Sequence, residues 1–171
     1  MNKTRHIEVD LDSLMEMLAS SDGMTRQKAR ESLVARGEPA VPSLINALQT
    51  STSDEVRWEA AKALGELVDA RSIPALVKAL EDSESDVAWL AAEALRQFKR
   101  RAWSPLLQAL IESEGNSGSL RQGAHQVFVH QKEEGFNDAL ASLIEGLQPR
   151  AVPESTVFTA KEVLARMKAN T

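Results

Sequence analysis

Cysteine and tyrosine are absent from the 171 residues, and aromatic residues make up only 4% of them. Without cysteine there is no disulfide, no thiolate zinc site and no cysteine nucleophile. No stretch approaches the ~18 consecutive apolar residues that a membrane-spanning helix needs. The N-terminal MNKTRHIEVD also lacks the apolar core of a signal peptide. We therefore expect a cytoplasmic protein that does not contact a membrane.

The residue types that are abundant favour helices. Hydrophobic residues make up 43% of the chain, alanine and leucine dominate, and β-branched runs are short. The net charge is −5, from 20 basic and 25 acidic side chains. An acidic chain repels a phosphate backbone on average, which disfavours nucleic acid as a partner.

Two short phrases alternate along the chain. VRWEAAKAL (56–64) recurs as VAWLAAEAL (87–95), and weaker copies begin at residues 25, 120 and 156. A second phrase lies between these copies, as LMEML (14–18), LINAL (44–48), LVKAL (76–80), LLQAL (106–110) and LIEGL (143–147). Self-similarity at a period of about 30 residues is typical of repeat architectures. The two phrases, each written five times, predict ten helices.

The longer phrase has the period of an amphipathic helix. Its apolar stripe recurs at helical spacing in Val56, Ala60, Ala63, Leu64 and Leu67. Because one helical pair cannot bury such a stripe, the pairs are expected to stack into a solenoid.

The resulting domain is predicted to follow an N-terminal tail, residues 1–9. Asp54 is the predicted N-cap of the second long-phrase helix, and the small pair Ala60-Ala61 predicts a close approach of neighbouring helices. The predicted domain spans residues 10–168, with repeats at 10–37, 40–69, 72–101, 103–132 and 136–168.

Residues 56–87 resemble the short HEAT-like repeat named for phycobilisome lyases, through V-R-x-x-A-A-x-A-L-G, a turn, and P-x-L-x-x-A-L. The tetratricopeptide and ankyrin signatures fit less well. The resemblance implies an all-α fold, a right-handed α-solenoid of about five two-helix repeats. It also implies that the long-phrase helices line the concave face and the short-phrase helices the convex face. Such proteins are typically partner-binding scaffolds, and a few are chromophore lyases or their chaperones.

The chain departs from this repeat pattern in two places. Ala88 stands where other copies carry Arg26, Arg57 and Arg121, so a ladder of Asp–Arg pairs between turns is predicted to be interrupted there. Longer connections at 115–119 and 131–138 flank the fourth long-phrase helix. They are interpreted either as surface-loop drift or as a lip over the concave groove.

The third position of the long phrase points away from the buried stripe. Trp58 lies about 200° around the helix from Ala60, on the edge predicted to face the groove. Trp58 and Trp89 are interpreted either as anchors for a partner, since tryptophan is enriched at binding hot spots, or as packing against a neighbouring helix. The candidate partner-binding residues on this edge are Gln27, Glu31, Trp58, Lys62, Glu66, Trp89, Glu93, Gln97, Gln122, Gln126 and Phe158.

Other conspicuous residues receive structural interpretations. Trp103 is predicted to pack in the core or a turn. The basic run 99–101 is predicted to end the third long-phrase helix, where cations complement the helix dipole; a phosphate contact is the alternative. His125 and His130 are about 140° apart on a helix and so cannot share a metal ion on one face. We predict no metal, no cofactor and no catalytic residue.

The leading functional prediction is a non-enzymatic scaffold or adaptor that binds a protein or peptide on its concave face. A phycobilin lyase-like or chromophore-chaperone activity is the first alternative. DNA binding of the alkylation-repair type is the second, and the acidic floor of Glu31, Glu66, Glu93 and Glu162 argues against it. The predicted state is a monomer or a weak end-to-end dimer, which would form through apolar patches at Met17, Val157 and Met167.

Overall fold

The computed structural model describes residues 9–169, which form ten α-helices and two short 3-10 turns and contain no strand. The predicted tail lies, except for Val9, outside this range. The α-helices are α1 (Leu11–Met17), α2 (Gly23–Arg36), α3 (Val41–Thr50), α4 (Asp54–Leu67), α5 (Ile73–Ala79), α6 (Ser85–Gln97), α7 (Arg100–Glu112), α8 (Gly118–Phe128), α9 (Asn137–Gly146) and α10 (Pro153–Ala169). The 3-10 turns η1 (Glu38–Ala40) and η2 (Ala70–Ser72) precede α3 and α5.

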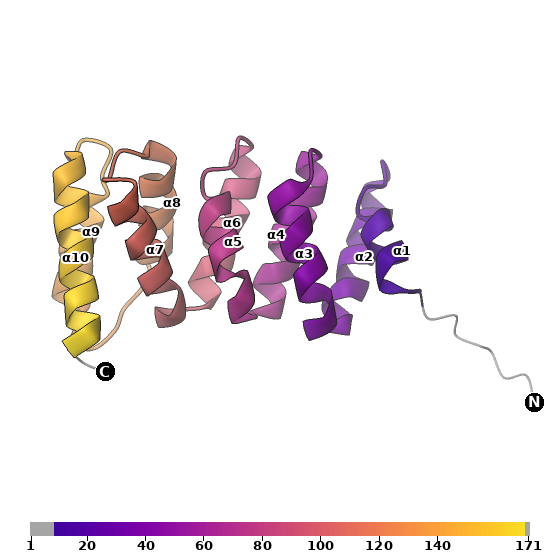
Figure 1. Cartoon of the computed structure of the whole chain (residues 1–171), viewed down its shortest axis with the longest axis horizontal. Coiled ribbons are helices and arrows are strands. Elements are labelled where there is room, and N and C mark those ends of the chain that lie inside the picture. The colour runs from indigo at the N-terminus through magenta and orange to yellow at the C-terminus, as the bar shows by residue number, and fades with distance from the viewer. Residues whose placement is uncertain (1–8, 170–171) are drawn as a thin grey trace, which may run out of the picture.

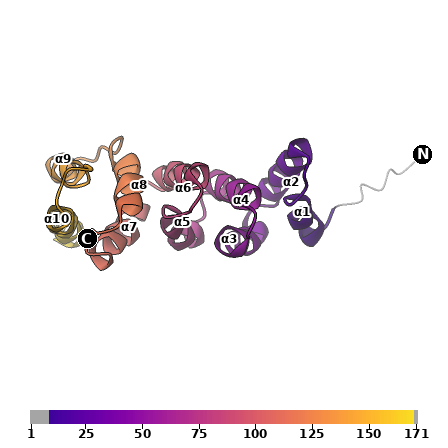
Figure 2. The same cartoon turned by 90° about the horizontal axis from the view of Figure 1, so that it is seen from above.

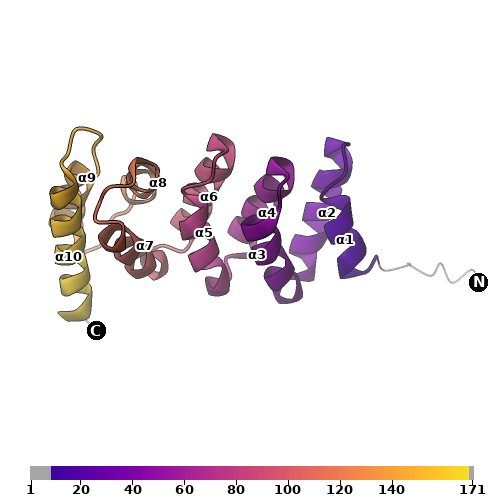
Figure 3. The same ribbon diagram turned by 45° about the horizontal axis from the view of Figure 1, so that its top comes forward.

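The helices form two rows, as the repeated phrases predict. In Figure 1, α1, α3, α5 and α7 lie in front of α2, α4, α6 and α8, and the rotated views in Figures 2 and 3 show the same arrangement. Along the second row, α2 packs on α4, α4 on α6, and α6 on α8. The predicted α-solenoid is confirmed. We call the exposed side of α2, α4, α6 and α8 the even-numbered face.

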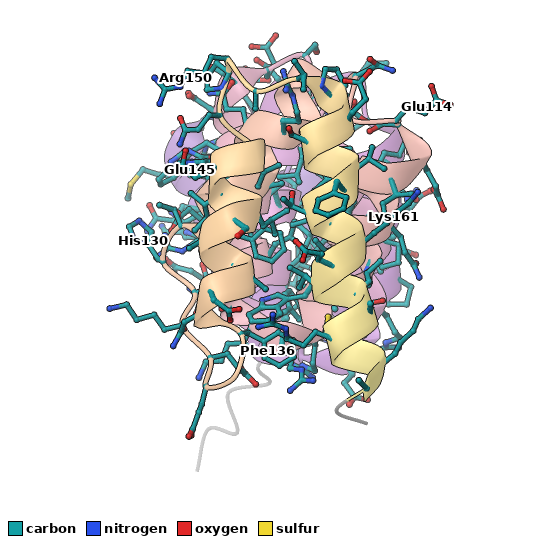
Figure 4. The ribbon with its side chains drawn as sticks, turned by 90° about the vertical axis from the view of Figure 1, so that its left-hand side faces the viewer. Glu114, His130, Phe136, Glu145, Arg150 and Lys161 are labelled. Atoms are coloured by element: carbon teal, nitrogen blue, oxygen red, sulfur yellow. The ribbon has the colours of Figure 1, made fainter. Side chains whose placement is uncertain are left out.

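The last pair departs from this alternation. The repeat alignment places α10 in the same row as α8, but α10 packs against α7 and α9. Figure 2 accordingly shows α10 in the row of α7, and α9 on the side of α8. The connection over residues 129–136 is longer than the one between α4 and α5, and it leads the chain from α8 to α9 on the same side of the stack. Viewed from this end in Figure 4, Phe136 lies between the lower ends of α9 and α10.

Small residues set the spacing within the even-numbered row. Ala60, Ala61, Ala91 and Ala92 are all fully buried. A Cβ built on Gly65 would lie only 2.9 Å from the Cβ of Ala94. Because real Cβ atoms do not approach so closely, α4 and α6 require the glycine there. The close approach predicted from the paired alanines is confirmed.

Trp103 is a core residue, as predicted. Its side chain is fully buried, and its ring meets Phe128 and Phe136 edge to face at centroid distances of 5.9 and 5.7 Å. Such contacts add about 0.5–1.5 kcal/mol each beyond simple area burial. This aromatic cluster joins α7, α8 and the start of α9.

Two helix boundaries differ from their predictions. The N-cap of α4 is Ser53, whose hydroxyl accepts the Val56 N–H at 3.3 Å, and Asp54 is the first helical residue. The basic run was predicted to end α6, yet Lys99 precedes α7 with a φ of 52° and Arg100 begins that helix. Cations oppose the dipole at a helix N-terminus. Arg100 instead bonds to the Glu133 carboxylate at 3.1 Å and lies over the Phe136 ring.

Candidate partner-binding surface

Trp58 is only partly exposed on the even-numbered face. Its indole packs against the apolar core, and the ammonium of Lys62 lies 4.7 Å from the ring centroid. Lys62 is four residues further along α4, so the two side chains are neighbours on one helical edge. The aromatic face of Trp58 therefore already carries a cation from its own helix.

Trp89 occupies the equivalent place on α6 but is 51% exposed. The residue four positions further on is Glu93 rather than lysine. The Glu93 carboxylate accepts a hydrogen bond from Arg96 at 2.6 Å. Trp89 is the one tryptophan that offers a large apolar surface to solvent, and a large exposed aromatic is the usual anchor of a binding surface.

A hollow of about 440 Å³ lies beside Trp89, between α6 and α8. It begins at the turn before α6 and runs to the first two turns of α8. Its main lining residues are Asp82, Asp86, Ala88, Trp89, Gln122 and Gln126. Ala88 contributes to the open space because its methyl group replaces an arginine.

The arginine at the same position of the preceding repeat shows what Ala88 omits. Arg57 donates from Nε and one Nη to both carboxylate oxygens of Asp82, at 2.8 and 2.9 Å, and to the Ser51 carbonyl at 3.1 Å. Burial raises the pKa of Asp82, but the hydrogen bonds from Arg57 and from the Glu84 N–H outweigh it and leave the pKa below its usual value. The predicted Asp–Arg pairing between turns thus exists at Arg57 and is interrupted at Ala88. Arg26 and Arg121 instead donate to the Ser20 and Ala151 carbonyls, at 2.8 Å each.

A second hollow, of about 690 Å³, extends the first towards the C-terminal end of α9. The two hollows share Ser119, Gln122 and Gln126 as lining residues. The far wall includes His125, whose Nε2 lies 3.2 Å from the Gln148 amide nitrogen. One side of α8 therefore lines both hollows, and Trp89 stands beside the first of them. The two adjoining hollows are treated together as one groove. We call this the α8 groove.

A buried ion network between α2 and α4 escaped the sequence interpretation. Arg30 is 6% exposed and Glu59 5% exposed, and they pair at 2.9 Å; Arg30 also reaches Glu66 at 2.5 Å. The signal was present in the repeat alignment. Arg30 stands where later copies have Ala61 and Ala92, and Glu59 where the next copy has Leu90. Opposite charges in adjacent repeats, at positions that hold Leu90 and Ala92 in the third copy, indicate a pair.

Ten of the eleven predicted partner-binding residues lie on the even-numbered face. They are carried by α2, α4, α6 and α8, and some pair locally, as Gln27 does by donating to Glu31 at 2.8 Å. Phe158 is separated from them. It is 66% exposed on α10, which belongs to the row of α7. The residues predicted to form an end-to-end contact, Met17, Val157 and Met167, are each partly buried.

Other kinds of site find little support. Within residues 9–169, no group of three or more histidine, aspartate or glutamate side chains is placed to hold a metal ion. Over the same range, no helix is both long enough and apolar enough to span a membrane.

A family model for HEAT repeats matches residues 41–128, which run from α3 to the end of α8. No curated protein sequence matches the chain. Three solved structures align over most of it: two engineered proteins determined by a structural genomics consortium and a designed armadillo repeat protein.

These alignments are distant. The first engineered protein is 21% identical and covers 93% of this chain and 79% of its own, at a TM-score of 0.46. The second is 22% identical over 93% and 81%, at 0.45, and the armadillo protein 20% identical over 94% and 83%, at 0.43. Such scores add nothing on function. The HEAT-repeat match, by contrast, spans just over half of the residues. On that match, and on the paired helices that it covers, the chain belongs to the HEAT-repeat family.

Proposed function

We propose that this protein is a non-enzymatic interaction module that binds a protein or peptide partner on its even-numbered face. The observation that carries the proposal is Trp89, a 51% exposed indole beside the α8 groove. When a partner covers an exposed tryptophan, the unfavourable contact between its apolar surface and water is removed. Its indole N–H can also donate one directional hydrogen bond to the partner.

The acidic charge on the even-numbered face favours a protein partner over DNA. The exposed acidic groups of this face include Glu31 and Glu66, and the α8 groove adds Asp86. A duplex would have to bring its phosphates against these carboxylates. A peptide can instead use the groove's amide side chains as both donors and acceptors.

The test is capture of partners from the native cell by crosslinking, with the intact protein as bait. Trp89→Ala is expected to reduce the yield of the main crosslinked partner at least tenfold, in line with a hot-spot contribution of about 2 kcal/mol or more. Phe158→Ala is the matched control, since it removes an aromatic side chain that is even more exposed, at 66% against 51%, from a different row of helices. Equal yields from the Trp89 variant and the unmodified chain would refute binding at this face.

A further inference from the structure

Two tryptophans in equivalent places differ in the charge beside them. Trp58 and Trp89 hold the third position of the same repeated phrase on α4 and α6. The ammonium of Lys62 lies 4.7 Å from the Trp58 ring centroid, whereas Glu93 occupies the matching position next to Trp89. The ring face of tryptophan attracts cations. One repeat therefore supplies its own cation, and the next presents an indole without one.

The hollow beside Trp89 carries negative charge only. Asp82 and Asp86 are its charged lining residues. Both oxygens of Asp82 are bonded to Arg57. Asp86 is exposed and has no pairing cation within residues 9–169. Asp86 lies in the first turn of α6, where the positive end of the helix dipole offsets part of its charge. The negative charge that remains and the ring face of Trp89 are expected to attract a cation together.

The hollow, at about 440 Å³, also has the volume to take an extended side chain. Ala88 leaves open the space that an arginine fills in the preceding repeat, and Gln122 and Gln126 line the opposite wall. Lysine and arginine combine an apolar stem with a charged end. The apolar stem can pack on the Trp89 indole, and the charged end can pair with the Asp86 carboxylate.

We propose that the hollow between α6 and α8 binds a lysine or arginine side chain of the partner, with its stem across Trp89 and its charged end near Asp86. This inference rests on the proposed binding function and specifies the partner's chemistry: an extended segment that carries a basic residue. The net charge of −5 favours the approach of such a segment.

The test uses the full chain and two synthetic five-residue peptides, with a third that carries arginine. One has a central lysine flanked by serine and glycine; the other replaces the lysine with norleucine, which keeps the stem and removes the charge. The chain has three tryptophans, so its indole N–H resonances can be followed individually by NMR during titration. We expect the lysine peptide to shift the Trp89 resonance and to bind roughly 3- to 30-fold more tightly than the norleucine peptide. An arginine peptide should behave like the lysine peptide.

Two variants make the same charge change, one beside Trp89 and one at a control position. Glu93→Lys places a lysine four residues after Trp89, as Lys62 follows Trp58. In this variant the lysine peptide should shift the Trp89 resonance no more than the norleucine peptide does. Glu112→Lys makes the same charge change at an exposed position on α7 and should leave the response intact. The Trp103 resonance, from a fully buried side chain, reports whether either variant disturbs the fold.

Equal Trp89 shifts with the lysine and norleucine peptides would overturn the cation proposal while leaving an apolar anchor, and hence the proposed function, in place. A response that survives Glu93→Lys would overturn it as well. Failure of the proposed function has a different signature, namely partner capture that does not depend on Trp89 at all.

Discussion

At the scale of single residues, the Arg30–Glu59 pair is the least expected feature of the chain. Each side chain is about 7% exposed, so both charges have lost most of their water. The attraction within such a pair roughly repays that desolvation, which makes it weak evidence for stability. Removing one partner, however, strands a buried charge. We therefore infer that the pair specifies which repeat stacks on which more than it strengthens the stack.

This interpretation predicts a strong coupling between the two positions. Arg30→Ala alone should lower the free energy of unfolding by about 3–5 kcal/mol, because Glu59 is left buried with only the longer contact to Arg26, at 4.0 Å. The double variant Arg30→Ala with Glu59→Leu introduces the residue types that the next interface carries at these positions, Ala61 and Leu90, and should recover most of that loss. Urea unfolding monitored by circular dichroism measures both. If the double variant is no more stable than the single one, the network contributes through contacts other than this pair.

At the scale of helices, the stack depends on how closely α4 and α6 approach. Ala60 is fully buried on α4, and Gly65 on the same helix has no room for a Cβ. Interiors packed at this density tolerate neither added volume nor an unpaired charge.

Ala60→Glu should therefore unfold the array or lower its melting temperature by roughly 10 °C or more. Ala35→Glu introduces the same side chain at an exposed position on α2 and should leave the melting temperature nearly unchanged. Thermal unfolding followed by circular dichroism compares the two. An unchanged melting temperature for Ala60→Glu would show that the packing between helices is looser than these distances imply.

At the scale of the whole molecule, the last pair of helices is arranged differently from the pairs before it. Because α10 covers α7, the last four helices form a closed group around Trp103 and Phe136. In solenoids each unit contacts only its neighbours, so damage to one end is expected to stay local.

Ala160→Arg places a charge at a fully buried position of α10. We expect hydrogen exchange to accelerate at least tenfold over residues 100–169, while residues 11–67 keep their protection, because few contacts link the two ends. Hydrogen-exchange mass spectrometry resolves these segments. Ala165→Arg, at an exposed position of the same helix, serves as the control. Equal loss of protection along the whole chain would contradict local stability.

The sequence by itself determined the ten helices, the alternation of the first eight and the apolar stripe, because helical periodicity is a local property repeated in every copy. It also placed Trp89 off that stripe, from the angle between positions on one helix. It could not place α10: the alignment with Trp58 put Phe158 on the even-numbered face, whereas α10 packs against α7. The α8 groove and the Arg30–Glu59 pair likewise depend on the separation of helices from different repeats. Only the tertiary structure fixes that separation, because it results from packing between residues distant in the chain.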